Sequence, residues 1–251
     1  MKKFPFFILL VLFSIKVYSA PPYDGTIFYF PNVINTTDPT TFQELIYIGK
    51  DNRKMYDRRK GGGWINKNVF LFNAIYEERK IEIQVNPEFK NSDTAFEEAL
   101  MYSKIIGQLP NFLLTNVKTV WIHKGNEGWG GGNNNLLIHT GRSKEYILKG
   151  ILGEAFIHEA AHTSLDWDYG GSVKQRDWDK ARKKDKRYIS DYAKKHPNRE
   201  DVAESILTWI VVRYHMDRTA KYEIDKILKA IPNRLKYFDE QNFDMYPIVP
   251  R

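Results

Sequence analysis

The sequence predicts an α+β fold in which a twisted, mostly antiparallel sheet covers one helix, followed by a helical C-terminal half. Apolar runs of strand length are concentrated before residue 140, whereas apolar residues at helical spacing dominate after it. An apolar helix pattern beginning near Lys149 carries the motif His158-Glu159-Ala160-Ala161-His162. The 251 residues, 42% of them hydrophobic, suffice for one sizeable core and do not require two domains.

Residues 1 to 19 have the composition of a secretory signal peptide. Lys2-Lys3 precede an apolar stretch from Phe4 to Ile15, and cleavage after Ser19 places small residues at the expected positions. The apolar stretch is short for a membrane span, so no stable membrane insertion is expected; an uncleaved anchor or a buried helix is the alternative. We therefore expect a secreted or extracytoplasmic protein, periplasmic in a Gram-negative host, with one domain over residues 20–251.

Charge and cysteine content narrow the possible functions. Removal of Lys2, Lys3 and Lys16 with the signal lowers the formal net charge from +7 to +4, which does not indicate a nucleic-acid binder. The chain contains no cysteine, so a metal thiolate site and a cysteine nucleophile are excluded. Asn35-Thr36-Thr37 is a glycosylation acceptor only in a eukaryotic host. A monomer is expected.

The first part of the domain, residues 20–90, is predicted to be rich in strands. Strands are expected at Thr26 to Phe30 and Phe42 to Ile48, and the charged segment Asp51 to Lys60 with Gly61-Gly62-Gly63 is expected to be a solvated turn. A hairpin follows, with the apolar run Val69 to Tyr76 as its first strand and an alternating second strand that ends at Val85.

The remaining part, residues 91–251, is the predicted catalytic part. A helix capped by Ser92 or Asp93 ends at Gly107, and strands Val117 to His123 and Leu136 to Thr140 are joined by a flexible segment from Gly125 to Asn135.

The helical half then begins with the basic segment Lys174 to Lys195, a solvated helix and loop or a rim that attracts acidic substrate. Helices are expected from Arg199 to His215 and from Lys221 to Ala230. Pro232 is expected to interrupt the chain before a short amphipathic segment to Glu240.

The two histidines of the motif are candidate metal ligands. Residues four apart on a helix project from the same face, so His158 and His162 can bind one ion while Glu159 lies beside its open coordination position. Burying unpaired imidazoles in an apolar helix would cost on the order of a few kcal/mol each, and a ligand role removes this cost.

A catalytic zinc site uses three protein ligands and keeps one position for water, so a third ligand is needed. Glu200 and Glu204 lie four apart beside the apolar face of the second long helix, where two carboxylates would repel each other without a cation. Glu200 is predicted to bind the metal, and Glu204 to accept the free N–H of a ligand histidine. Asp166 and Asp168 are rival third ligands.

These residues resemble the gluzincin pattern of the anthrax lethal factor and Pro-Pro endopeptidase group of secreted metallopeptidases. The resemblance covers roughly residues 150 to 215; the N-terminal third resembles only uncharacterised secreted proteins. It implies a zincin-like fold, one Zn²⁺ ion bound by the two histidines and Glu200, and an oxyanion-stabilising tyrosine upstream of Glu200. That tyrosine is Tyr192, with Tyr188 as the alternative.

The implied activity is hydrolysis of an extended peptide or protein substrate, with Glu159 as the general base. The substrate is expected along an exposed strand edge at Asn133 to Thr140, against Asn135, Leu136 and Ile138. His123 and His139 are expected to be structural or solvent-facing. Two alternatives stay open: a secreted non-catalytic zinc-binding module, and a zinc hydrolase of non-peptide amides.

Overall fold

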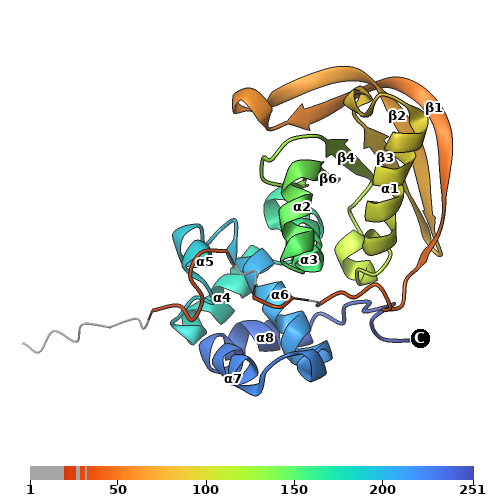
Figure 1. Ribbon diagram of the computed structural model, residues 1–251. Coiled ribbons are helices and arrows are strands. Elements are labelled where there is room, and N and C mark those ends of the chain that lie inside the picture. Colours follow the sequence, from red (N-terminus) through yellow and green to blue (C-terminus); the bar gives the residue numbers. More distant parts are fainter. Residues whose placement is uncertain (1–19, 27–28, 32) are drawn as a thin grey trace, which may run out of the picture.

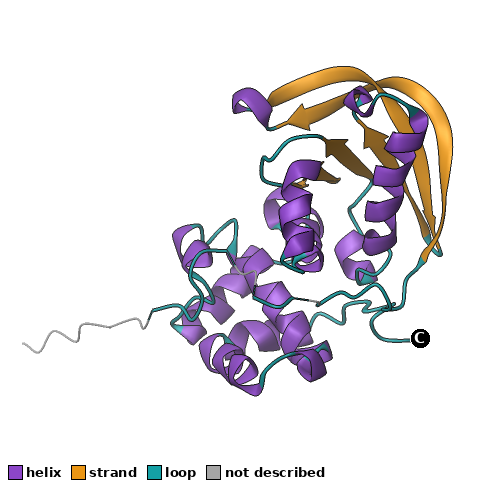
Figure 2. Ribbon diagram, in the orientation of Figure 1, coloured by secondary structure: helices purple, strands orange, loops and turns teal. Residues whose placement is uncertain are grey.

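The computed structural model describes residues 20–26, 29–31 and 33–251, so the predicted signal peptide lies outside the described residues. The described chain is α+β, with a mixed sheet at one end and helices α4 to α8 gathered at the other (Figures 1 and 2). The strands are β1 (Phe42–Asp57), β2 (Gly63–Tyr76), β3 (Arg79–Val85), β4 (Thr119–His123), β5 (Gly130–Gly132) and β6 (Asn135–His139). The α-helices are α1 (Ser92–Ile106), α2 (Thr140–Leu148), α3 (Leu152–Ser164), α4 (Gln175–Asp185), α5 (Asp191–Lys195), α6 (Asp201–Tyr214), α7 (Lys221–Ala230) and α8 (Pro232–Asp239).

The six strands have the order β1-β2-β3-β4-β6-β5. The pairs β1–β2, β2–β3 and β5–β6 are antiparallel, whereas β3–β4 and β4–β6 are parallel. β3 and β4 are parallel because α1 carries the chain back between them. β4 and β6 are parallel because the chain first reverses through β5, which forms a hairpin with β6. The motif helix α3 follows the β6–α2 unit and packs under β5.

Several predicted elements need correction. Asp51 to Asp57, predicted as a turn, belongs to β1, which pairs with β2 down to Asp57↔Gly63. No strand forms in the described part of residues 26–30, and Ile27 and Phe28 lie outside the described residues. The cap of α1 is Asn91, whose side chain accepts a hydrogen bond from Thr94 N at 2.9 Å.

Residues 125–135 also differ from the prediction of a flexible connection. They contain β5 and a tight turn in which Asn133 and Asn134 both have positive φ, at 50° and 64°. Two successive residues with positive φ are typical of the two-residue hairpin turn that matches strand twist, and asparagine tolerates this conformation. The sequence signal was therefore present, in Asn-Asn between a glycine run and an apolar run.

The N-terminal segment lies against the helical half. Tyr23 forms a parallel bridge with Ser190, just before α5, and its hydroxyl donates to Glu223 Oε2 at 2.5 Å. The backbone N–H groups of Tyr29 and Phe30 donate to the two carboxylate oxygens of Glu154 in the first turn of α3. One apolar core runs from Tyr23 to Met245 and includes residues of the sheet, of α1 and α3, and of the C-terminal helices α4 to α8.

Candidate metal centre

Helix α3 is buried on almost all sides because its neighbours approach closely. A Cβ atom on Gly131 would lie 1.8 Å from the carbonyl oxygen of Glu159, so only glycine lets β5 pack on the helix backbone. The Thr163 hydroxyl accepts from Gly132 N at 2.8 Å and donates to Asn135 O at 2.9 Å. These contacts fix the motif helix under the edge of the sheet.

The predicted ligands meet at one point. The Nε2 atoms of His158 and His162 are 3.1 Å apart, as expected for residues one turn apart on a helix. Oε2 of Glu200 lies 3.1 Å from Nε2 of His162 and 3.3 Å from Nε2 of His158. All three residues are buried, and together they could hold one metal ion.

Glu200 reaches this point from the residue directly before α6, where it is 1% exposed. The positive end of the helix dipole favours a carboxylate at that position. Its second oxygen, Oε1, lies 3.0 Å from Nε of Arg199, whose side chain is 70% exposed. The sequence does not single out Arg199, because a basic residue next to acidic residues is common on protein surfaces.

Each histidine has a carboxylate near its Nδ1 atom, the ring nitrogen that does not face the triad. Oδ2 of Asp166 lies 2.7 Å from Nδ1 of His162, and Oε1 of Glu204 lies 3.4 Å from Nδ1 of His158. Glu204 thus lies on the predicted side of His158, but the predicted hydrogen bond does not form between these two atoms. Asp166, predicted only as a rival ligand, instead faces the outer nitrogen of a ligand, and Asp168 is exposed. Such partners fix the ring orientation and tautomer of metal-binding histidines.

The charge distribution favours a cation. Burial by itself lowers the pKa of His158, but the contact with Glu200 outweighs it and the pKa is raised. For His162, burial is outweighed by hydrogen bonds to Asp166 and Glu200, and the pKa is well above its ordinary value. Burial opposes ionisation of Glu200 too, yet the two histidines lower its pKa. A site that attracts protons in this way also attracts a metal ion, which competes for the same atoms.

Glu159 differs from its neighbours in the motif. It is half-buried rather than buried. Its carboxylate makes no hydrogen bond or ion pair with any other residue that the structure describes, whereas Glu200 and Glu204 each lie near the His158 imidazole. The side chain is therefore available to a ligand of the site.

The structure separates the two candidate tyrosines. Tyr192 lies beside the triad: burial and the neighbouring Glu200 carboxylate together raise the pKa of its phenol. The Tyr188 ring instead stacks on the Arg234 guanidinium at 5.5 Å. Of the two, only Tyr192 is placed next to Glu200.

The predicted substrate edge is wrong. Asn135, Leu136 and Ile138 lie in β6, and all three are buried. β6 pairs with β4 along its whole length, and its other side pairs with β5 through residues 135 to 137. Asn135 and Leu136 therefore offer no free edge, and Ile138, which lies past the end of this pairing, is fully buried. The last strand at this end of the sheet is β5, and its central residue Gly131 adjoins Glu159.

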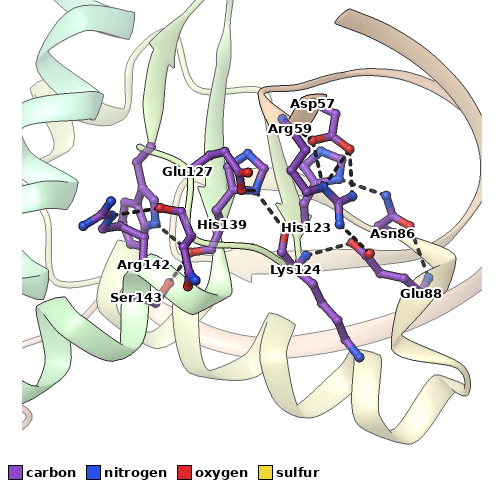
Figure 3. Close-up of polar contacts among 12 residues, drawn as sticks. Asp57, Arg59, Asn86, Glu88, His123, Lys124, Glu127, His139, Arg142 and Ser143 are labelled. Carbon is purple, nitrogen blue, oxygen red and sulfur yellow. Dashed lines mark hydrogen bonds and ion pairs between the residues drawn. The ribbon is translucent and has the colours of Figure 1, made fainter. Parts of the chain in front are cut away.

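His123 and His139 form a separate buried pair at the ends of β4 and β6 (Figure 3). Nδ1 of His123 lies 2.9 Å from Nδ2 of Asn86, and Nδ1 of His139 lies 3.0 Å from the carbonyl oxygen of Lys124. Burial lowers the pKa of His123 to about 4, so this imidazole is neutral at neutral pH. Neither histidine faces solvent, and both are held by local contacts.

Comparison of the chain with protein-family models, with curated proteins and with solved structures found no match.

Proposed function

We propose that the chain is a secreted zinc endopeptidase of the gluzincin type, with a zincin-like fold. The triad of His158, His162 and Glu200 is the observation that supports this most strongly. Atoms bound tetrahedrally at about 2.0 to 2.1 Å from zinc lie roughly 3.3 to 3.4 Å from one another. The three observed separations, 3.1, 3.1 and 3.3 Å, are close to that spacing. Two histidines and one glutamate are also a common ligand set of catalytic zinc sites.

The surroundings of the triad favour a catalytic over a purely structural ion. Structural zinc sites usually have four protein ligands, whereas only three such groups meet here among the described residues. The half-buried Glu159 adjoins them without a protein partner in the described chain. An open fourth position beside a free carboxylate is the arrangement that hydrolysis needs.

When bound, zinc would supply a polarised water and a Lewis acid for the scissile carbonyl. Glu159 takes the proton of the attacking water and delivers it to the leaving amine. The Tyr192 phenol, whose raised pKa keeps it protonated, donates a hydrogen bond to the developing oxyanion. Asp166 holds the His162 imidazole in orientation through a hydrogen bond. Glu204 lies 3.4 Å from Nδ1 of His158, where its charge favours a proton on that nitrogen.

The proposed substrate is an extended peptide or protein segment that pairs with β5, the strand at this edge of the sheet. Secretion is proposed from the composition of residues 1–19 alone. Among the described residues, no helix combines the length and the apolar character that crossing a bilayer would need.

Metal analysis and peptide hydrolysis test the proposal together. The purified protein should contain one zinc ion per chain and cleave members of a quenched-fluorescent peptide library, and chelation should abolish cleavage. Glu159→Gln should retain zinc and lose hydrolysis, because the ligands remain and the base does not. Glu97→Gln on the exposed face of α1 is the matched control and should behave like the wild type.

The other outcomes identify the alternatives. Zinc without cleavage of any peptide, combined with a lower melting temperature after chelation, would indicate a non-catalytic zinc module. Hydrolysis of small amides but not of peptides would indicate a hydrolase of non-peptide amides. Unchanged peptide hydrolysis in Glu159→Gln would overturn the assignment.

A further inference from the structure

On the basis of the proposed function, we propose that Arg58 makes this enzyme select peptide substrates with an acidic side chain. This side chain lies at the position next to the substrate residue whose peptide bond is cleaved. The binding site is a groove of about 240 Å³ on the outer face of β5. The aromatic side chains that line it are Tyr56, Trp64, Trp121 and Tyr169.

The two faces of β5 have different neighbours. The Cβ direction of Gly131 points to the backbone of α3 at Glu159. The Cβ directions of Gly130 and Gly132 point the opposite way, to the Arg58 guanidinium and the Tyr169 ring. A Cβ atom on Gly130 would lie 2.7 Å from Nη2 of Arg58. The guanidinium therefore lies directly across the outer face of the strand.

Arg58 and Arg59 are adjacent, and within the described ranges only Arg59 has acidic partners. Arg59 forms ion pairs with Asp57 and Glu88, each at 2.7 Å. Arg58 makes no hydrogen bond or ion pair with any other residue of the described chain, although its side chain is half-buried. Its planar set of N–H donors thus remains available, and a carboxylate is the group that such a fork binds best.

Arg58 lies close to the part of β5 that contacts the motif helix. Gly130, whose Cβ direction meets Nη2 of Arg58, directly precedes Gly131, whose Cβ direction meets the backbone of Glu159. An extended peptide paired with β5 would direct alternate side chains to opposite faces. One side chain would then face α3 and Glu159, and the next would enter the groove beside Arg58.

Charge complementarity identifies the ligand class. A partly desolvated cation without a counterion in the described part of the chain favours an anionic side chain. Lys54, whose Nζ lies 5.0 Å from the centroid of the Trp64 ring in the groove wall, adds a second positive charge nearby. Hydrogen bonds between two charged groups are stronger than those between a charged and a neutral group, so an acidic residue should raise kcat/KM by about tenfold over its amide.

The test uses peptides with amidated C-termini, so that only a side chain can supply the carboxylate. At the position next to the cleaved residue, Asp or Glu should give a higher kcat/KM than Asn, Gln or Lys. Arg58→Gln should remove this preference and Arg58→Glu should reverse it toward Lys, with zinc content unchanged. Lys60→Gln, an equal charge change two residues away, is the control and should keep the preference.

Cleavage without acidic preference, or the same preference in Arg58→Gln, would overturn the inference and leave the endopeptidase proposal intact. If no peptide is cleaved, the endopeptidase proposal fails on its own. Binding to Glu159→Gln then decides the inference: fluorescence anisotropy should show tighter binding of acidic than of amide peptides, lost in Arg58→Gln. Equal binding of both peptides would overturn it. If a peptide with Asn or Gln at this position is cleaved well only when its C-terminus is a free carboxylate, Arg58 binds terminal carboxylates instead of acidic side chains.

Discussion

Nδ1 of His162 lies 2.7 Å from Oδ2 of Asp166, four residues further along the chain. The carboxylate lies just beyond the end of α3, so one short stretch of chain supplies both the candidate ligand and the group that orients it. Replacing Asp166 by Asn should lower metal affinity by about 10- to 100-fold while leaving the ligands in place. Competition with a chromogenic chelator measures the change. Asp168→Asn, at an exposed position, should have no effect; equal losses in the two variants would contradict the orienting role.

The approach of β5 to α3 should be sensitive to one methyl group. Gly131→Ala would place Cβ against the Glu159 carbonyl oxygen, a backbone atom that cannot rotate away. Forcing the two elements apart should lower the free energy of unfolding by about 1 to 3 kcal/mol, measured by urea denaturation. Gly63→Ala meets no atom within 4 Å and serves as the control. A Gly131→Ala protein as stable as this control would contradict the close packing.

A buried ion network holds α8 against α4 and α6. Nε of Arg234 lies 2.9 Å from Oδ2 of Asp185, another guanidinium nitrogen donates to Asp201, and all three side chains are buried. Arg234→Leu strands both carboxylates, so it should destabilise the protein by about 3 to 5 kcal/mol. Thermal unfolding checks this.

Arg213→Leu provides the comparison for that variant. Arg213 pairs with Asp239 at 2.9 Å in a partly exposed setting, where such pairs contribute about 0.2 to 1 kcal/mol. Losses of similar size in the two variants would be inconsistent with a dominant role of burial.

Glu154 should make stability depend on pH. Burial raises the pKa of its carboxyl to about 8, and the backbone N–H contacts from Tyr29 and Phe30 lower it only in part. The folded state then keeps a proton that the unfolded chain releases above its ordinary pKa, 4.5. The free energy of unfolding should therefore fall as pH rises from 4.5 to about 8, by at most about 1.4 kcal/mol per pH unit.

Urea denaturation from pH 5 to 8.5 measures that slope. Glu154→Gln cannot titrate, so its curve should be flatter than that of the wild type over this range, and Glu97→Gln should retain the wild-type slope. Parallel curves for wild type and Glu154→Gln would contradict the raised pKa.

The two candidate ligands on α3 could be predicted from sequence because their spacing is local. His158 and His162 are fixed by one helical turn, and the buried acidic pair Glu200 and Glu204 follows from its place beside an apolar face. The role of Asp166 could not be predicted, because it depends on how the chain turns after Ser164. That turn places the carboxylate behind the ring rather than at the metal position.

The strands could be predicted less well than the candidate ligands, because the part of β1 beyond Gly49 and the strand β5 have little apolar patterning. Most residues of β1 beyond Gly49 are exposed or half-buried, so Asp51 to Asp57 lacks the alternation that indicates a half-buried strand. Pairing with β2, set by long-range register, outweighs this local composition. The three residues of β5 are all glycine, and no side-chain pattern exists there to predict a strand.

The glycine composition of β5 has a consequence for how selectivity could change. A strand without side chains offers a neighbouring chain only its N–H and C=O groups, which are the same for every amino acid. Any discrimination at this edge must then come from side chains that other elements contribute, such as Arg58 and Tyr169. Substitutions there could redirect recognition while the strand and the helix beneath it keep their packing.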